Sequence, residues 1–282
     1  MNTFQDLEFT SDRFTLNKVV GAGGFGKVFE GHFNEERVAV KILHIRKEEN
    51  MIMSKSLKAE LNISGLQHPN VVRIISSFCE PELNRYVIVM EFVSYMNLQQ
   101  IIDDLDNNSL SYSDRLRYSL HISSALAFVH DNNIIHLDVK PANILVCGDG
   151  LCKLCDFGCS LNLNKSDDSE FSNYAHLGGT MKYKAPELLR GWKPTPMCDM
   201  YSLALTMWQM KHREIPFSAL DVHFVVFGVV SRGLRPSDID LSDIYTNSYD
   251  CCIARGWDRN PNERFTAQDL AAILRILLDD DE

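Results

Sequence analysis

The segment that most constrains this chain is the octapeptide HLDVKPAN at residues 136–143. Within six residues it carries a carboxylate (Asp138), a cation (Lys140) and a side-chain amide (Asn143). Phosphoryl transfer requires a base, a cation and a metal-binding group around one reacting oxygen. Asp156-Phe157-Gly158 begins thirteen residues after Asn143, and its carboxylate would bind Mg²⁺. The spacing therefore predicts a phosphoryl-transfer site in which Asp138 is the base, while Asn143 and Asp156 are metal ligands.

A glycine-rich segment near the N-terminus fits the pattern G-x-G-x-x-G-x-V. It consists of Gly21, Ala22, Gly23, Gly24, Phe25, Gly26, Lys27 and Val28. Glycines let the backbone approach phosphate oxygens and offer N–H groups without steric cost. A plain glycine hairpin has a similar composition, and a dinucleotide-binding loop would lead into a helix. Because a strand is predicted after Gly26, the segment is interpreted as a cover over the phosphates of ATP.

Lys41 ends a short apolar strand, Val38-Ala39-Val40-Lys41. Burying a lysine alone is costly, so a buried Lys41 needs an anionic partner. The phosphates of ATP and a carboxylate on the following helix would supply one, and Glu60 is the candidate carboxylate. A solvated lysine at the end of a strand is the alternative interpretation.

Composition and net charge limit the partners and the cellular compartment that we expect for this chain. Its formal net charge of −10 argues against nucleic acid or an anionic membrane as the main partner, because both require a basic face. The eight cysteines do not form a compact disulfide framework, and residues 1–10 do not read as a signal peptide. No apolar run approaches the ~20 residues of a membrane span. We therefore expect free thiols and a cytoplasmic location.

The order of predicted elements indicates an α+β fold in two lobes. A small β-rich lobe is expected at about residues 12–92 and a larger helical lobe at about 98–280, joined near 91–97, so that residues 1–282 make one domain. Ligands favour clefts between such parts. The predicted strands are Phe14–Val20, Lys27–Phe33, Arg37–Leu43, Val71–Phe78, Tyr86–Phe92, Ile144–Val146 and Cys152–Cys155. The predicted helices are Ser54–Leu66, Asp114–His130, Met200–Met210, Val222–Val230, Ile244–Arg255 and Thr266–Leu278.

Taken in order with Ala185-Pro186-Glu187, these motifs resemble the protein kinase superfamily from about Phe14 to Leu278. The resemblance implies a bilobal fold with ATP and Mg²⁺ in the cleft, and a protein as the substrate. It implies that Asp199 hydrogen-bonds the catalytic loop, and that Glu187 and Arg264 form a buried ion pair. The residues that it places around ATP are Gly21–Gly26, Val28, Ala39, Lys41, Glu60, Met90, Glu91, Phe92 and Asn97.

Several features narrow the resemblance to particular groups within the superfamily. Lys140, together with Gly179-Thr180 before Ala185-Pro186-Glu187, resembles serine/threonine kinases rather than tyrosine kinases. The runs AELN at 59–62, HLDVKPANIL at 136–145, CDFGCS at 155–160 and LGGT at 177–180 resemble the Mos kinases. That resemblance implies a monomeric enzyme that activates a MAP kinase kinase and controls meiosis in oocytes.

Two alternatives remain open at this point. The first is a pseudokinase scaffold, although Lys41, Asp138 and Asp156 are all present. The second is another kinase of the MAP kinase pathway, Raf-like or mixed-lineage, although those usually carry arginine where this chain has Leu137. The same leucine predicts activity without phosphorylation of the activation segment, since arginine at this position often binds the loop phosphate. Cys155 is interpreted as a small apolar filler rather than a reactive thiol.

Overall fold

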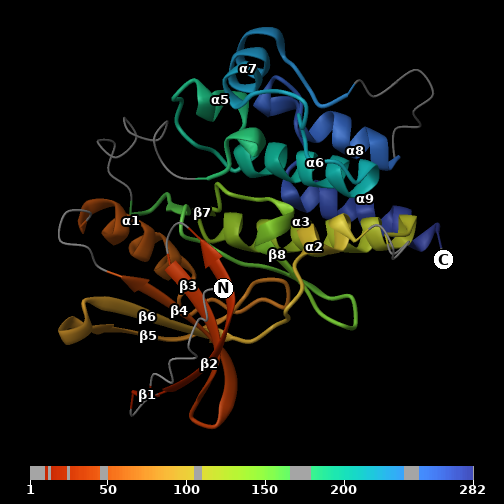
Figure 1. Cartoon of the computed structure of the whole chain (residues 1–282). Coiled ribbons are helices and arrows are strands. Elements are labelled where there is room, and N and C mark those ends of the chain that lie inside the picture. Colours follow the sequence, from red (N-terminus) through yellow and green to blue (C-terminus); the bar gives the residue numbers. More distant parts are fainter. Residues whose placement is uncertain are drawn as a thin grey trace.

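The computed structural model describes residues 10–11, 14–23, 26–44, 50–104, 110–165, 179–237 and 248–281 (Figure 1). A sheet, drawn in red to ochre, forms one lobe, and helices in yellow to blue form the larger one. The two-lobed arrangement expected from the sequence is therefore present. Among the described residues, none of the helices combines the length and the apolar composition that a membrane span requires.

The smaller lobe is an antiparallel sheet with the strand order β1-β2-β3-β4-β6-β5. Alternate residues of β4 and β6, such as Val38, Val40, Val87 and Val89, are buried in the core on one face. A helix, α1, and a 3₁₀ turn at Leu61–Ile63 follow β4. The elements are β1 (Thr10–Ser11), β2 (Phe14–Gly23), β3 (Gly26–Phe33), β4 (Glu36–His44), α1 (Asn50–Glu60), β5 (Ile74–Glu80) and β6 (Arg85–Glu91).

The larger lobe is built around α6 (Met197–His212), in which every residue from Cys198 to Met210 is buried. This confirms the buried helix predicted at Met200–Met210, and α3 packs against both α6 and α9. Two small two-stranded sheets, β7 with β10 and β8 with β9, lie on the side of the lobe that faces the larger sheet (Figure 1). The other elements are α2 (Leu98–Asp103), α3 (Tyr112–Asp131), β7 (Ile134–Ile135), β8 (Ile144–Val146), β9 (Cys152–Leu154), β10 (Leu161–Asn162), α5 (Pro186–Leu189), α7 (Val222–Phe227), α8 (Tyr249–Gly256) and α9 (Ala267–Asp279).

Several predicted boundaries were wrong. Strand β2 continues through Gly23 and β3 begins at Gly26, whereas the predicted strands ended at Val20 and began at Lys27. The helix α1 ends at Glu60 instead of running to Leu66. Val71 lies before β5 and forms an isolated bridge with Leu154. Residues 244–247 of one predicted helix are outside the described residues, and α8 itself begins at Tyr249. The short helices α2 and α5 were not predicted.

The two lobes are fastened to each other where the segment before β5 meets β9. Leu154 N donates to Asn70 O at 2.8 Å, and Val72 N donates to Leu154 O at 3.0 Å. Beside this seam, Glu91 Oε1 accepts from Arg73 N and from Lys153 Nζ, each at 2.8 Å. One carboxylate oxygen thus joins the end of β6, the approach to β5 and β9.

Candidate active site

The loop at residues 136–143 is held by Asp199, a fully buried residue of α6. Asp199 accepts from His136 N and Leu137 N, both at 2.8 Å. His130 Nε2 lies 2.9 Å from the same carboxylate. Leu137 has a φ of 66°, which is strained for a leucine and persists only where its surroundings impose it. The contact that the resemblance implied for Asp199 is thus present, and it fixes the backbone just before Asp138.

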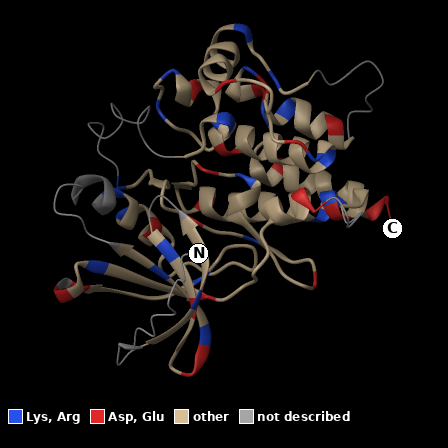
Figure 2. Cartoon of the chain, viewed as in Figure 1, with Lys and Arg blue, Asp and Glu red and all other residues tan. Residues whose placement is uncertain are grey.

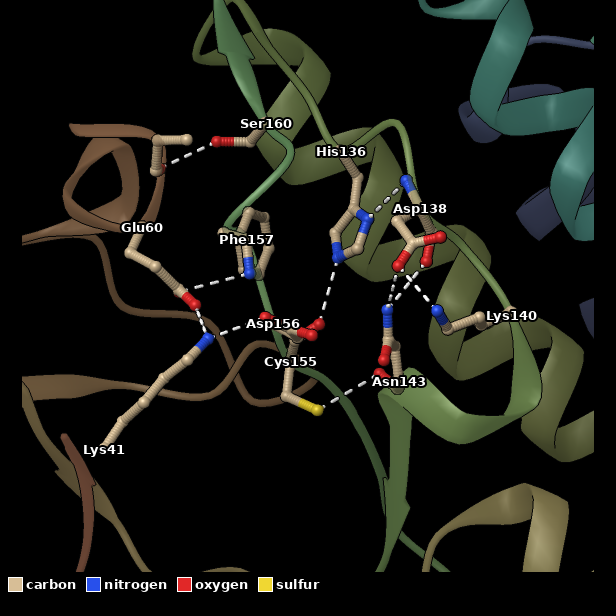
Figure 3. Close-up of polar contacts among 11 residues, drawn as sticks. Lys41, Glu60, His136, Asp138, Lys140, Asn143, Cys155, Asp156, Phe157 and Ser160 are labelled. Atoms are coloured by element: carbon tan, nitrogen blue, oxygen red, sulfur yellow. Dashed lines mark hydrogen bonds and ion pairs between the residues drawn. The ribbon is translucent and has the colours of Figure 1, made fainter. Parts of the chain in front are cut away.

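Asp138, Lys140 and Asn143 meet at one point, as the octapeptide predicted (Figure 3). Asp138 Oδ2 accepts from Lys140 Nζ at 2.7 Å and from Asn143 Nδ2 at 3.0 Å. Its other oxygen, Oδ1, accepts from Thr180 N at 2.8 Å, and Lys140 Nζ also reaches Thr180 Oγ1 at 2.6 Å. A carboxylate, an ammonium group and a threonine hydroxyl therefore surround the place where an acceptor hydroxyl would enter.

A second cluster joins Lys41 of β4, Glu60 at the end of α1 and Asp156 (Figure 3). Lys41 Nζ forms an ion pair with Glu60 and lies 2.7 Å from Asp156 Oδ1. Phe157 N donates to the other oxygen of Glu60 at 3.2 Å. The structure thus brings Lys41 to Glu60, the partner chosen from sequence, and adds Asp156 as a second one.

In this cluster the buried ammonium of Lys41 faces the carboxyl groups of both Glu60 and Asp156. Burial opposes the charge of Lys41, but attraction from Glu60 and Asp156 outweighs it and raises the pKa of Lys41. Burial, offset only in part by Lys41, raises the pKa of Glu60 to about 7. Burial also acts against ionisation of Asp156, but Lys41 lowers the pKa of Asp156 to about 2. The cluster therefore pairs an ionised Asp156 with the Lys41 ammonium, beside a Glu60 carboxyl that burial makes harder to ionise.

The donor set fits the Mg²⁺ predicted from sequence. The Asp156 side chain is 36% exposed. Asn143 lies beside it, because the N–H of the preceding residue, Cys155, donates to Asn143 O at 3.0 Å. Mg²⁺ is usually held by one or two carboxylates together with substrate phosphates and water.

Strand register decides which side chains of the sheet face the cleft. Val28 pairs with Lys41, and Ala39 pairs with Met90. Cross-strand partners share a face, as do residues two apart on one strand. Val28, Ala39, Lys41 and Met90 therefore share one face, opposite the apolar core that contains Val40. These four side chains line one wall of the predicted nucleotide cleft.

The glycine-rich segment forms the hairpin between β2 and β3 (Figure 1). A strand follows it, as predicted, instead of the helix that a dinucleotide-binding loop would require. Gly26 has a φ of 152°, and a Cβ there would lie 2.2 Å from the Ile42 carbonyl oxygen, so no other residue fits. Gly24 and Phe25 are outside the described residues. Gly21, Ala22 and Gly23 lie within β2.

The residues predicted to join the two lobes and to lie around ATP make structural contacts that the sequence did not reveal. The Glu91 side chain is engaged by Arg73 and Lys153, as described above. Asn97 caps α2, its side chain accepting from Gln100 N at 2.9 Å. The Arg37 guanidinium stacks 4.0 Å above the Phe92 ring. Contact of Glu91, Phe92 and Asn97 with the nucleotide therefore stays a prediction.

Sequence reasoning missed the hydroxyl of Ser160, which ties the segment after Asp156 to α1 (Figure 3). Ser160 Oγ donates to Ala59 O at 2.8 Å and accepts from Asn62 Nδ2 at 3.0 Å. Cys155 Sγ donates to Asn143 O at 3.3 Å, and burial raises the pKa of this thiol. Cys155 is therefore a packed side chain rather than a nucleophile.

A family model described as the protein kinase domain matches residues 14–273. The chain belongs to the protein kinase family. This protein kinase is 38% identical to the serine/threonine-protein kinase mos of Patiria pectinifera, over 95% of its own length and 76% of the relative. It is 36% identical to the proto-oncogene serine/threonine-protein kinase mos of Sus scrofa, over 94% of its length and 81% of the relative. It is thus a Mos-like serine/threonine protein kinase, and its family implies ATP as the phosphoryl donor, typically with Mg²⁺.

The ion pair that the resemblance implied for this kinase is present in the larger lobe. Arg264 Nη1 lies 2.6 Å from Glu187 Oε1, and Nη2 lies 3.0 Å from Oε2. Both residues are buried, and Cys198 Sγ also approaches Glu187 at 3.4 Å. The bidentate pair anchors α5, and with it the segment that begins at Thr180.

Replacing Lys41 by methionine should lower kcat/KM for ATP by about 100-fold or more, because a charge that orients the phosphates is lost. Glu60→Gln should cause a smaller loss, on the order of tenfold, because it acts through the position of Lys41. The measurement is steady-state phosphorylation at varied ATP. Lys58→Met is the matched control, since Lys58 lies on the exposed face of α1. Full activity of Glu60→Gln would assign the partner role to Asp156 alone.

Proposed function

We propose that this kinase phosphorylates a MAP kinase kinase on serine or threonine and controls meiosis in oocytes, acting as a monomer in the cytoplasm. The observation that carries the site assignment is the position of Lys140 Nζ between Asp138 Oδ2 and Thr180 Oγ1, at 2.7 and 2.6 Å. The choice of substrate is supported by the resemblance to Mos kinases that the sequence runs carry.

In the proposed mechanism, Asp138 orients the substrate hydroxyl and accepts its proton as the hydroxyl oxygen bonds to the γ-phosphorus of ATP and the bond from that phosphorus to ADP breaks. Lys140 is placed to stabilise charge on the transferring phosphoryl group, and Lys41 holds the phosphates of ATP. Asp156 and Asn143 would hold Mg²⁺, which supplies neutralisation of phosphate charge when it is bound. The protein contributes positioning and electrostatic stabilisation rather than covalent chemistry.

The test is phosphorylation of a catalytically inactive MAP kinase kinase by the purified chain, followed by phosphoamino-acid analysis. We expect phosphoserine or phosphothreonine on the activation segment of the substrate, and none with Asp138→Asn in place of the wild-type enzyme. A phosphotyrosine product would contradict the serine/threonine assignment. An enzyme that phosphorylates general protein substrates but leaves the MAP kinase kinase unmodified would contradict the proposed substrate.

A further inference from the structure

A network of hydrogen bonds on the sheet of the smaller lobe reaches the connection between the two lobes. Arg37 of β4 donates from Nε to Glu30 Oε1 of β3 at 2.8 Å. Its Nη2 donates to the Tyr95 hydroxyl at 2.6 Å, and this hydroxyl donates to Glu30 Oε2, also at 2.6 Å. Figure 2 shows acidic and basic segments next to one another in the lower part of this sheet. Glu30, Arg37 and Tyr95 thus close a ring of hydrogen bonds, here named the Tyr95 clamp.

Aromatic and cationic contacts reinforce the clamp. The Arg37 guanidinium that lies over the Phe92 ring belongs to it, and the Phe92 and Tyr95 rings meet edge to face with centroids 5.0 Å apart. Lys18 Nζ lies 3.9 Å from the centre of the Tyr95 ring and 4.0 Å from Glu30 Oε2. Glu30 is 9% exposed and Tyr95 is 45% exposed. The hydrogen bond from Tyr95, against the opposing effect of burial and together with Arg37, lowers the pKa of Glu30. The clamp therefore closes over an ionised and nearly buried carboxylate.

Tyr95 belongs to the short segment, residues 92–95, that connects the lobes. Before this segment, Glu91 is the last residue of β6. After it, Met96 O accepts from Val146 N of β8 at 3.0 Å. The backbone has thus reached the larger lobe immediately after Tyr95, but the Tyr95 side chain is bonded to the sheet of the smaller one. The clamp therefore fixes the course of the connection as well as its two ends.

The strand register places the clamp next to the wall of the predicted nucleotide cleft. Glu30 follows Val28 by two residues on β3 and pairs with Ala39 on β4. Arg37 precedes Ala39 by two residues on the same strand. Residues two apart on one strand share a face, and so do cross-strand partners. Glu30 and Arg37 therefore lie on the face that carries Val28 and Ala39, so the clamp borders the cleft wall.

We propose that Glu30, Arg37 and Tyr95 are positioning residues that hold residues 92–95 in the conformation that binds the nucleotide. This inference rests on the proposed binding of ATP in the cleft, but it does not depend on the choice of protein substrate. A segment that is already ordered loses less conformational freedom on binding, which strengthens the affinity. The clamp belongs to neither of the clusters around Asp138 and Lys41. It should therefore affect the affinity for the nucleotide and leave the transfer step unchanged.

The test uses Tyr95→Phe, which keeps the ring contacts and removes the hydroxyl that Arg37 and Glu30 share. We expect Kd for ADP, measured by calorimetry, and KM for ATP to rise together by about three- to tenfold, because a hydrogen bond to a charged group is lost at a half-exposed position. The kcat at saturating ATP should stay within twofold of the wild type. Tyr112→Phe is the matched control, because Tyr112 is a similarly exposed tyrosine at the start of α3 in the larger lobe.

A double-mutant cycle measures whether the clamp acts as one unit. Arg37→Met removes both hydrogen bonds of the guanidinium and should weaken ADP binding at least as much as Tyr95→Phe does. Arg37→Lys should restore only part of the affinity, since an ammonium group lacks the planar fork of the guanidinium. The combined variant Tyr95→Phe/Arg37→Met should lose less than the product of the two single losses. Losses that multiply fully would show that the side chains act separately, and would overturn the clamp as a unit.

Two results for Tyr95→Phe would overturn the proposal. One is binding of ADP as tight as in the wild type, including the case in which only thermal stability falls. The other is a lower kcat with unchanged affinity for the nucleotide. If Arg37→Met does not fold, Tyr95→Phe decides alone. Wild-type enzyme that binds no ADP would overturn the proposed ATP site, and the clamp proposal with it. Wild-type enzyme that binds ADP but leaves the MAP kinase kinase unmodified would contradict only the proposed substrate.

Discussion

Replacing Asp138 with asparagine will lower kcat for protein phosphorylation by roughly a hundred- to ten-thousandfold. The substituted amide keeps the shape of the carboxylate but cannot accept the proton of the substrate hydroxyl. It also disturbs the contacts of Lys140 and Thr180, which both donate to Asp138 in the wild type. The measurement is single-turnover transfer to a protein substrate at saturating ATP.

Asp149→Asn is the matched control for this substitution. Asp149 accepts a hydrogen bond from Leu151 N at 3.0 Å in the turn between β8 and β9, so it is a structural carboxylate outside the cluster around Asp138. Its variant should keep wild-type activity. Circular dichroism must show that Asp138→Asn is folded. A folded Asp138→Asn enzyme with normal turnover would remove Asp138 from the mechanism.

Replacing Arg264 with methionine will lower the free energy of unfolding by about 3–5 kcal/mol, because it leaves the buried Glu187 carboxylate without its cation. The guanidinium also donates to Asp258 O at 2.9 Å and to Met197 O at 2.8 Å, and these carbonyls lose a donor as well. The measurement is equilibrium unfolding of the wild type and the variant in urea. The two free energies are compared if their dependence on urea concentration has the same slope.

Two further variants separate charge burial from simple loss of packing. Glu187→Met/Arg264→Met removes both charges and should recover part of the stability that Arg264→Met loses. Arg117→Met breaks the more exposed pair with Asp114 and should cost at most about 1 kcal/mol. An Arg264→Met protein that is no less stable than Arg117→Met would show that the buried pair does not hold α5 in place.

The sequence predicted well those parts of the site that lie close together along the chain. Asp138, Lys140 and Asn143 share one loop, so their spacing alone brings them near one another. Lys41 and Glu60 lie on different elements, and their pairing depended on identifying a helix that follows a strand. The end of that helix at Glu60 was not predictable, because residues 61–63 continue the apolar pattern while the backbone tightens into a 3₁₀ turn.

Other features depended on neighbours that the sequence does not reveal. Asn97 was assigned to the nucleotide by resemblance, yet its side chain caps α2, a short helix whose existence was not foreseen. The run from Val222 to Val230 was predicted as a helix, but nothing in it tells which face is covered. Only the packing of Val225 and Val229 against the lobe leaves Phe224 and Phe227 exposed. The exposure of these two rings was therefore visible only in the structure.

The fastening between the lobes determines how they can move. Asn70 and Val72 are hydrogen-bonded to the backbone of Leu154. The segment before β5 is therefore attached to the helical lobe, although it lies between two elements of the smaller lobe in the sequence. Glu91 adds a second attachment beside this one, because it accepts from Arg73 N and from Lys153 Nζ. A relative movement of the lobes that keeps these hydrogen bonds would be a rotation about this line and not a sliding of one lobe over the other. In the strand order, β2 and β3 lie on the other side of β4 and β6 from β5, so the glycine-rich hairpin is separated from this fastening by the width of the sheet.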